Sequence, residues 1–276
     1  MKVEGTTKLT LLRIREGQRG EVEDLVAREF PFTIVLNNQE LVTLLCSPTK
    51  LRYLAVGFLF SEGLVKDKAE LKKVLLDERR GIARVETVQA LELAPDFLFR
   101  RFITSGCGRG ASFYHAIDAQ NVARIETEVN ISPEAVLELT KEFQRLSEIY
   151  LATHGVHGAA LSDTRKILAF SEDIGRHNAV DKIFGQCLLE EIPTEDKILL
   201  SSGRISSEML LKAAKGRIPI IISISAPTDL AVKLASELGV TLIAFVRGKK
   251  FNIYANEWRV VNGLPGSEDH RPDPTA

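Results

Sequence analysis

The sequence predicts an α/β fold: a three-layer sandwich formed by the second half of the chain, with a smaller β-rich region before it. Beyond about residue 130, short apolar segments alternate with segments of helical periodicity, as in βαβ units around a mostly parallel sheet. Before that point, strand-like apolar runs predominate. We therefore expect a β-rich N-terminal region at 1–130, an α/β domain at 131–262 and a disordered tail at 263–276.

Strands dominate the expected N-terminal region. Alternating or continuous apolar residues predict them at 8–14, 32–36, 40–45 and 81–93. Asn37-Asn38 separates the middle two strands, and asparagine tolerates the positive φ that a tight hairpin turn requires. A helix is expected after this hairpin, with Ser47 as its N-cap, Pro48 at its first position and Gly63 at its end.

The second half is expected to alternate between helices and strands. Ser132-Pro133 predicts the start of a helix at 134–150, because proline is favoured in the first helical turn. Further helices are expected at 178–189, 206–214 and 227–238, the last ending at Gly239. Strands are expected at 156–161, 166–170, 197–201, 218–224, 241–246 and 251–254. Polar residues that follow these strands are candidate site residues, because α/β proteins bind ligands at the carboxyl ends of their strands.

Composition limits the classes of function. The 276 residues include 36 basic and 37 acidic side chains, and a net charge of −1 gives no global reason to bind nucleic acid. No apolar run approaches the roughly 20 residues of a membrane helix, and the N-terminus lacks the apolar core of a signal peptide. We therefore expect a cytoplasmic protein that binds no membrane. The 3 scattered cysteines predict free thiols.

Cys107 is the cysteine best suited to chemistry. In Thr104-Ser105-Gly106-Cys107-Gly108-Arg109-Gly110, the glycines leave room for a large molecule and Arg109 favours the reactive thiolate. This setting predicts a nucleophile or a sulfur carrier; the alternative is a small residue in a turn beside a core strand. Cys46 and Cys187 lie in apolar segments and are expected to be buried packing residues.

His154 and His157 are close enough in sequence to suggest a metal site. However, no acidic residue or cysteine stands nearby at ligand spacing, and a deaminase-type zinc site would need His-x-Glu with Pro-Cys-x-x-Cys. We therefore predict no metal site. His157 is expected to begin a strand and to act in a cleft as a hydrogen-bonding or acid–base group, with a structural histidine as the alternative.

Polar loops follow four successive strands of the predicted sheet. Arg176 and His177 are the expected ligand contacts in the first loop, where Asp181 and Lys182 are interpreted as structural. In the second loop, Arg204 stands at a helix start and is suited to phosphate. The third loop, 223–228, offers hydroxyl groups. The fourth carries three cations and an aromatic ring, which suit a phosphate-bearing aromatic ligand, in the run Phe245-Val246-Arg247-Gly248-Lys249-Lys250. An ordinary helix cap or basic turn remains the alternative for the last three loops.

These motifs resemble the FdhD family of formate dehydrogenase accessory proteins. The resemblance covers roughly residues 30–260 and is carried by segments 58–63, 104–108, 172–182, 202–206, 225–227 and 245–248. It implies a cytidine-deaminase-like fold without the zinc site, and a homodimer. It also implies a sulfurtransferase activity that matures formate dehydrogenase.

By this resemblance, Cys107 would accept persulfide sulfur from a cysteine desulfurase. The acceptor would be the molybdenum (or tungsten) bis-guanine-dinucleotide cofactor, bound as a substrate by residues 245–250 before insertion into formate dehydrogenase. Gly110 departs from the family's usual Cys-Gly-x-Cys, which excludes a disulfide cycle within this loop. A single thiol can still carry a persulfide, because it can attack the donor's sulfur and later release it.

The roles of the remaining candidates follow from this hypothesis. Phosphate contacts are assigned to Arg176, Arg204 and Arg247, and polar or proton-transfer roles to His157 and His177. One alternative is a non-catalytic chaperone that holds the cofactor or the dehydrogenase, for which the basic loops would matter and Cys107 would not. A deaminase-like hydrolase is a further alternative, although the sequence lacks the metal ligands it would need.

Overall fold

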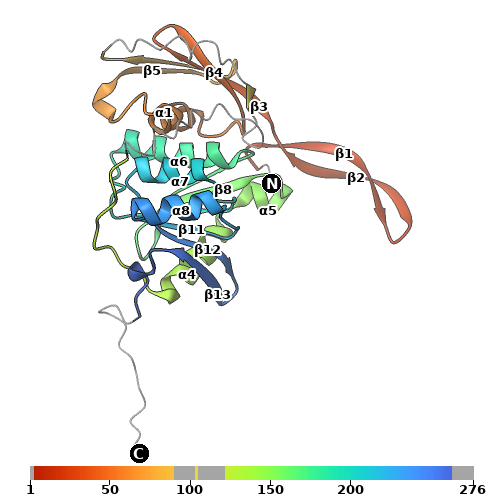
Figure 1. Cartoon of the computed structure of the whole chain (residues 1–276). Helices are drawn as coiled ribbons and strands as arrows, with labels where there is room; N and C mark the ends of the chain where they lie inside the picture. Colours follow the sequence, from red (N-terminus) through yellow and green to blue (C-terminus); the bar gives the residue numbers. More distant parts are fainter. Residues whose placement is uncertain (1–2, 90–102, 105–121, 263–276) are drawn as a thin grey trace, which may run out of the picture.

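The protein consists of two stacked units and a projecting hairpin (Figure 1). The computed structural model describes residues 3–89, 103–104 and 122–262, so Cys107 and the tail at 263–276 lie outside the described residues. A five-stranded sheet forms the upper unit in Figure 1, and a six-stranded sheet forms the lower unit. Within the described ranges, no helix is long and apolar enough to cross a membrane.

The six-stranded sheet is mixed rather than mostly parallel. Its strands are β8 (His157–Ser162), β9 (Ile167–Asp173), β10 (Ile198–Ser201), β11 (Ile220–Ser223), β12 (Thr241–Arg247) and β13 (Lys250–Ala255), in the order β13-β12-β11-β10-β8-β9. Only the β10–β11 and β11–β12 pairings are parallel. The expectation of a mostly parallel sheet was wrong because β8–β9 and β12–β13 are hairpins, which need no crossover helix.

Helices cover both faces of this sheet, which confirms the α/β three-layer sandwich. One face is covered by α6 (Arg176–Glu190), α7 (Ser207–Lys215) and α8 (Asp229–Leu238), and the other by α4 (Pro133–Arg145). Successive strand residues point to opposite faces, so Leu199 packs with α6–α8 while Leu200 packs with α4. The predicted caps Ser132 and Gly239 are confirmed: the Ser132 hydroxyl accepts from the amide of Ala135, and Gly239 ends α8 with φ of 72°.

The helix expected at 134–150 is divided in two. It ends at Arg145, and a shorter helix, α5, spans Glu148–Thr153. The Glu172 carboxylate, from β9, accepts hydrogen bonds from the amides of Ile149 and Tyr150 at 3.0 and 2.9 Å. This tertiary contact satisfies the free amides that begin α5, so the chain starts a new helix there.

The upper unit is built on the predicted hairpin. Its strands are β3 (Phe30–Leu36), β4 (Gln39–Cys46), β5 (Leu71–Asp77), β6 (Ile82–Thr87) and β7 (Ile103–Thr104), in the order β5-β6-β3-β4-β7. Asn37 and Asn38 turn the hairpin with φ of 46° and 66°, as predicted. Helix α1 (Leu51–Ser61) covers this sheet. The short 3-10 segment η1 (Lys68–Glu70) directly precedes β5, and a second one, η2 (Glu257–Arg259), follows β13. Strand β5 was not predicted.

The start of α1 differs from the prediction. Lys50, with φ of 53°, precedes the helix, and neither Ser47 nor Pro48 caps it. Ser47 instead bonds to the other unit: its amide donates to Asp173 Oδ2 at 3.0 Å, and its hydroxyl accepts from the amide of Ile174 at 3.1 Å. A partner distant in sequence therefore outcompetes the local cap.

The two units meet where α1 crosses α6. A Cβ atom at Gly57 would lie 1.7 Å from the carbonyl oxygen of Asp181, and one at Gly185 would lie 1.9 Å from that of Tyr53. Only glycine permits backbones to approach this closely. The proposed boundary near residue 130 remains a prediction, although Ile125 already packs in the core of the lower unit.

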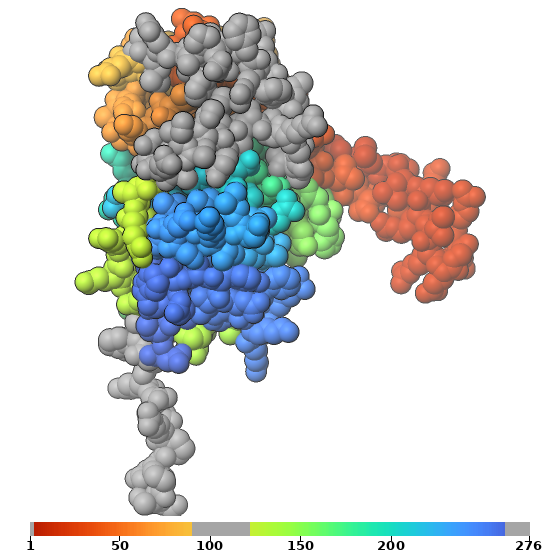
Figure 2. All heavy atoms as spheres, in the orientation of Figure 1, coloured from red at the N-terminus to blue at the C-terminus, as the bar shows by residue number. Residues whose placement is uncertain are grey.

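Strands β1 (Thr6–Arg15) and β2 (Gln18–Ala27) form a separate two-stranded sheet, which we call the arm. The segment predicted at 8–14 is therefore a strand, but its partner β2 was not foreseen. The arm extends away from both units (Figures 1 and 2). Its base lies against α5 and the turn that follows, where a Cβ atom at Gly155 would be 3.2 Å from the Ala27 side chain.

Candidate functional site

The predicted polar loops converge at one edge of the six-stranded sheet. Strands β9, β10, β11 and β12 run in the same direction and end at this edge, where β8 begins with His157 opposite Asp173. Hydrogen bonds join successive loops: the amide of Ile224 donates to the carbonyl of Ser201, and the amide of Phe245 to that of Ser225. The candidate residues that follow these strands in the sequence therefore lie together at one edge of the sheet.

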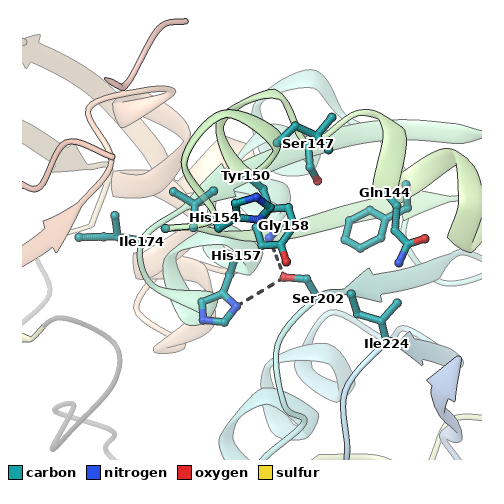
Figure 3. A pocket seen from close by; sticks show the side chains of 13 residues that line it. Gln144, Ser147, Tyr150, His154, His157, Gly158, Ile174, Ser202 and Ile224 are labelled. Carbon is teal, nitrogen blue, oxygen red and sulfur yellow. Dashed lines mark hydrogen bonds between the residues drawn. The ribbon is translucent and has the colours of Figure 1, made fainter. Parts of the chain in front are cut away.

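One cavity at this edge has a wall of aromatic rings and histidines (Figure 3). It encloses about 630 Å³ between α4, α5 and the start of β8. Tyr150 and His154 stack edge to face, with ring centroids 5.0 Å apart. Nδ1 of His157 lies 3.5 Å from the Ser202 hydroxyl, which accepts a hydrogen bond from the Gly158 amide at 2.9 Å. These residues offer a mostly apolar pocket with a few fixed polar atoms, as small-molecule sites generally do.

His157 is predominantly neutral at pH 7. Burial lowers its pKa below the usual 6.5, and the nearby positive charge of Arg176 lowers it further. A neutral imidazole carries one donor and one acceptor nitrogen, so His157 can hydrogen-bond a ligand or accept a proton. No group of three or more His, Cys, Asp or Glu side chains gathers as a metal site in the part of the chain that is described.

A second cavity, of about 580 Å³, adjoins the first and has cations at its rim. The two cavities share Gln144 and Ile224 as lining residues. Residues 246–249 line the second cavity, facing Lys141 and Glu138 of α4. The Arg247 guanidinium lies over the Phe245 ring, 4.9 Å from its centroid, which holds the charge at the loop. Gly248 has φ of 60° in the two-residue turn between β12 and β13. This rim suits a phosphate-bearing ligand.

The other predicted residues lie at the same edge, but outside the linings of these cavities. The Arg176 side chain packs on Gly203, where a Cβ atom would lie 2.9 Å from it. Nε2 of His177 lies 3.3 Å from the Glu208 carboxylate, a distance that allows an ion pair only when the imidazole is protonated. Arg204 is exposed at the end of β10. Lys250 begins β13 opposite Arg247.

A buried polar network ties the upper unit to this edge. Asp173 and Lys182, both fully buried, form an ion pair of 2.7 Å. Lys182 also donates to the Ser47 carbonyl at 3.2 Å, and Asn178 donates to Asp173 and to the Leu45 carbonyl, both at 2.9 Å. Lys182 is structural, as predicted. The network fixes the end of β4 beside His157.

Two of the three cysteines are unsuited to sulfur chemistry. Cys46 and Cys187 are buried, as predicted, and burial raises the pKa of each thiol to about 12. Neither forms an appreciable fraction of thiolate at neutral pH. Cys107 lies outside the described residues, but β7 ends at Thr104, three positions before it in the sequence. Strand β7 runs parallel to β4. Both strands therefore run toward the side of their sheet where the Asp173–Lys182 network contacts the end of β4.

Sequence reasoning missed the contribution of α4 and α5. Lys141, Gln144 and Tyr150 line the cavities, yet each looks like an ordinary residue of an amphipathic helix. Helical periodicity separates the buried face from the polar face, but it does not show which polar residue borders a cavity. The helix that crosses the sheet edge can be identified only once the chain is folded.

The fold and the site together define an α/β sandwich protein with a cation-rimmed double cavity at its sheet edge. Comparison with known proteins identifies the family. The sequence profile of the FdhD/NarQ family matches residues 27–261, and the chain belongs to this family.

Relatives match nearly the whole length of this chain. A protein of Bacillus pumilus named "Sulfur carrier protein FdhD" is 46% identical over 253 residues, which are 92% of this chain and 97% of the relative. A protein of Bacillus subtilis with the same name is 45% identical and covers 90% of this chain and 95% of its own. The crystal structure of a proposed formate dehydrogenase accessory protein from Desulfotalea psychrophila has a TM-score of 0.77 at 26% identity, covering 93% of this chain and 99% of that one.

Proposed function

We propose that this chain is a sulfur carrier that matures formate dehydrogenase, with Cys107 as the carrying residue. The observation that carries the proposal is the pair of adjoining cavities with a cationic rim at the edge of the six-stranded sheet. The Asp173–Lys182 network joins this edge to strand β4 of the upper unit. The names of the relatives support the sulfur-carrier role. The high pKa values of Cys46 and Cys187 leave Cys107 as the thiol suited to the task.

Loading of Cys107 is a balanced thiol exchange. The Cys107 thiolate attacks the outer sulfur of a persulfide on a cysteine desulfurase; the donor's S–S bond breaks as a new one forms, and the donor cysteine leaves as a thiolate. No net oxidation occurs. Release of the outer sulfur as sulfide consumes two electrons, which external thiols supply as they form a disulfide. This chemistry needs only one cysteine, in keeping with Gly110 in the loop.

The acceptor in this proposal is the molybdenum bis-guanine-dinucleotide cofactor, held as a substrate in the cytoplasm before its insertion into the dehydrogenase. Arg247 and Lys249 contact its phosphates, while the aromatic first cavity receives a planar ring. His157, neutral at pH 7, hydrogen-bonds the ligand. Arg176, His177 and Arg204 then act at the periphery of the site.

Mass spectrometry after incubation with a cysteine desulfurase and cysteine tests the carrier role. We expect one added sulfur, about 32 Da, on Cys107 and none on Cys46 or Cys187. Cys107→Ala is expected to fold, to remain unloaded and to leave formate dehydrogenase inactive. Full dehydrogenase activity with Cys107→Ala would refute the carrier role and favour the chaperone alternative.

Guanine nucleotide binding tests the cofactor site separately. We expect Arg247→Ala to weaken binding of guanosine diphosphate about tenfold or more and to reduce its salt dependence, because a phosphate contact is lost. Leu75→Ala, on an exposed edge strand of the upper unit, serves as the control. Unchanged binding by Arg247→Ala would contradict a phosphate contact in this cavity. It would not contradict the proposal that Cys107 is loaded with sulfur.

A further inference from the structure

The second cavity has one carboxylate among its cations. Its lining contains the cations Lys141, Arg247 and Lys249 and, among the described residues, a single acid, Glu138 of α4. In the part of the chain that the structure describes, no ion pair joins Glu138 to any of these cations. A carboxylate weakens the attraction of such a cavity for phosphate, so phosphate binding alone does not explain the presence of Glu138.

The stability of α4 does not explain Glu138 either. Glu134 and Glu142 stand four residues before and after it, and like charges at this spacing repel each other on a helix surface. Glu138 is exposed and lies beyond the first turn of α4, so it neither packs in the core nor favours the start of the helix. A ligand in the cavity accounts for a carboxylate at this position better than the fold does.

The chemistry of a carboxylate limits the ligands that it can recognise. It offers two acceptor oxygens and no donor, which fits a ring edge that carries two adjacent donors. Guanine has such an edge, because its N1–H group lies beside its 2-amino group. Adenine and cytosine instead present one amino group beside a ring nitrogen that accepts, and the lone pair of that nitrogen would face a carboxylate oxygen unfavourably. A carboxylate therefore favours guanine over these bases.

We propose that Glu138 is the residue that selects the base in the second cavity, by accepting hydrogen bonds from N1–H and the 2-amino group of guanine. The inference rests on the proposed cofactor site and adds a specificity-determining residue to it. The base then lies beside its own phosphates, which Arg247 and Lys249 contact from the opposite wall. The first cavity, which shares Gln144 and Ile224 with the second, is left for the rest of the cofactor.

Calorimetric titration of the full chain with two matched nucleotides tests the selection. Inosine diphosphate differs from guanosine diphosphate only in lacking the 2-amino group, so the pair isolates one of the two hydrogen bonds. We expect the wild type to bind guanosine diphosphate about tenfold or more tightly than inosine diphosphate, because a hydrogen bond to a charged group is lost. Adenosine diphosphate, which offers a carboxylate one donor and one opposing lone pair, should bind more weakly still.

The variant Glu138→Gln keeps the size of the side chain but replaces one acceptor oxygen with a donor. We expect it to bind guanosine diphosphate about tenfold or more weakly than the wild type does, and no more tightly than it binds inosine diphosphate. Pyrophosphate, which has no base, should bind the variant at least as tightly as the wild type, because a negative charge has left the cavity. The matched control Glu142→Gln, exposed one turn further along α4 and outside both cavity linings, should bind all three probes as the wild type does.

The three probes separate failure of this inference from failure of the proposed cofactor site. If Glu138→Gln binds guanosine diphosphate and pyrophosphate both more tightly, the carboxylate only repels phosphate; if it binds both more weakly, the carboxylate is structural. Equal affinity of the wild type for guanosine and inosine diphosphate would show that the 2-amino group is not recognised. Each of these results overturns selection by Glu138 but leaves the phosphate contact of Arg247 and the loading of Cys107 in place. A wild type that binds neither guanosine diphosphate nor pyrophosphate would refute the cofactor site itself, and this inference with it.

Discussion

Replacing Lys182 with methionine tests the buried network that joins the two units. The Lys182 ammonium forms an ion pair of 2.7 Å with Asp173 and donates to the carbonyls of Ser47 and Glu172 at 3.2 and 3.1 Å. Without it, the fully buried Asp173 carboxylate keeps only neutral donors. Breaking a buried ion pair costs about 3–5 kcal/mol of stability. Asp173 still accepts from the amides of Ser47 and Gly175 and from the Asn178 side chain, so we expect a loss at the lower end, about 3 kcal/mol.

Urea unfolding followed by circular dichroism measures this loss. The double variant Asp173→Asn/Lys182→Met removes both charges and should be at least about 1 kcal/mol more stable than the sum of the single effects predicts. Lys212→Met provides a comparison away from β4: Lys212 pairs at 2.7 Å with buried Asp181, which also accepts a hydrogen bond from Ser61 of α1 at 2.6 Å. If Lys182→Met costs less than about 1 kcal/mol, the network does not hold the units together.

Two further predictions concern the contact between α1 and the lower unit. Gly57→Ala would place a Cβ atom 1.7 Å from the Asp181 carbonyl, and we expect a loss of about 3 kcal/mol or more in thermal or urea unfolding. The control Gly20→Ala has no atom within 4 Å and should change stability by less than about 0.5 kcal/mol. Burial raises the pKa of Glu62 from 4.5 to about 7, so the folded state binds the proton more tightly, and the free energy of unfolding should fall as pH rises from 4.5 to 7. Glu62→Gln should abolish this fall and stabilise the protein by up to about 3 kcal/mol at pH 8; an unchanged pH profile would contradict the assignment.

Local signals in the sequence predicted most elements of the lower unit and the β3–β4 hairpin of the upper unit. The helix ends at Ser132 and Gly239 follow capping rules, and the turn at Asn37-Asn38 follows from the conformations that asparagine tolerates. That the candidate residues gather at one edge of the sheet followed from the alternation of strands and helices. These features depend on residues close together in the chain, which is why pattern analysis finds them.

Features that depend on distant partners were missed. Ser47 has the sequence of a helix cap, but Asp173 and Ile174 compete for it from 126 and 127 positions away. Glu172 divides a helix that periodicity predicts as continuous. The aromatic wall of the first cavity depends on the placement of Tyr150 by that interrupted helix.

The crossing of α1 and α6 limits the large motions that are open to this protein. Helix α1 belongs to the core of the upper unit and α6 to that of the lower, and at Gly57 and Gly185 their backbones touch. A hinge needs an interface that can slide or part, but sliding by one residue would drive a side chain into a neighbouring carbonyl. The two units therefore behave as a single block, and a ligand must enter a preformed cavity without the aid of domain closure. Its on-rate should accordingly be insensitive to solvent viscosity beyond the ordinary effect on diffusion.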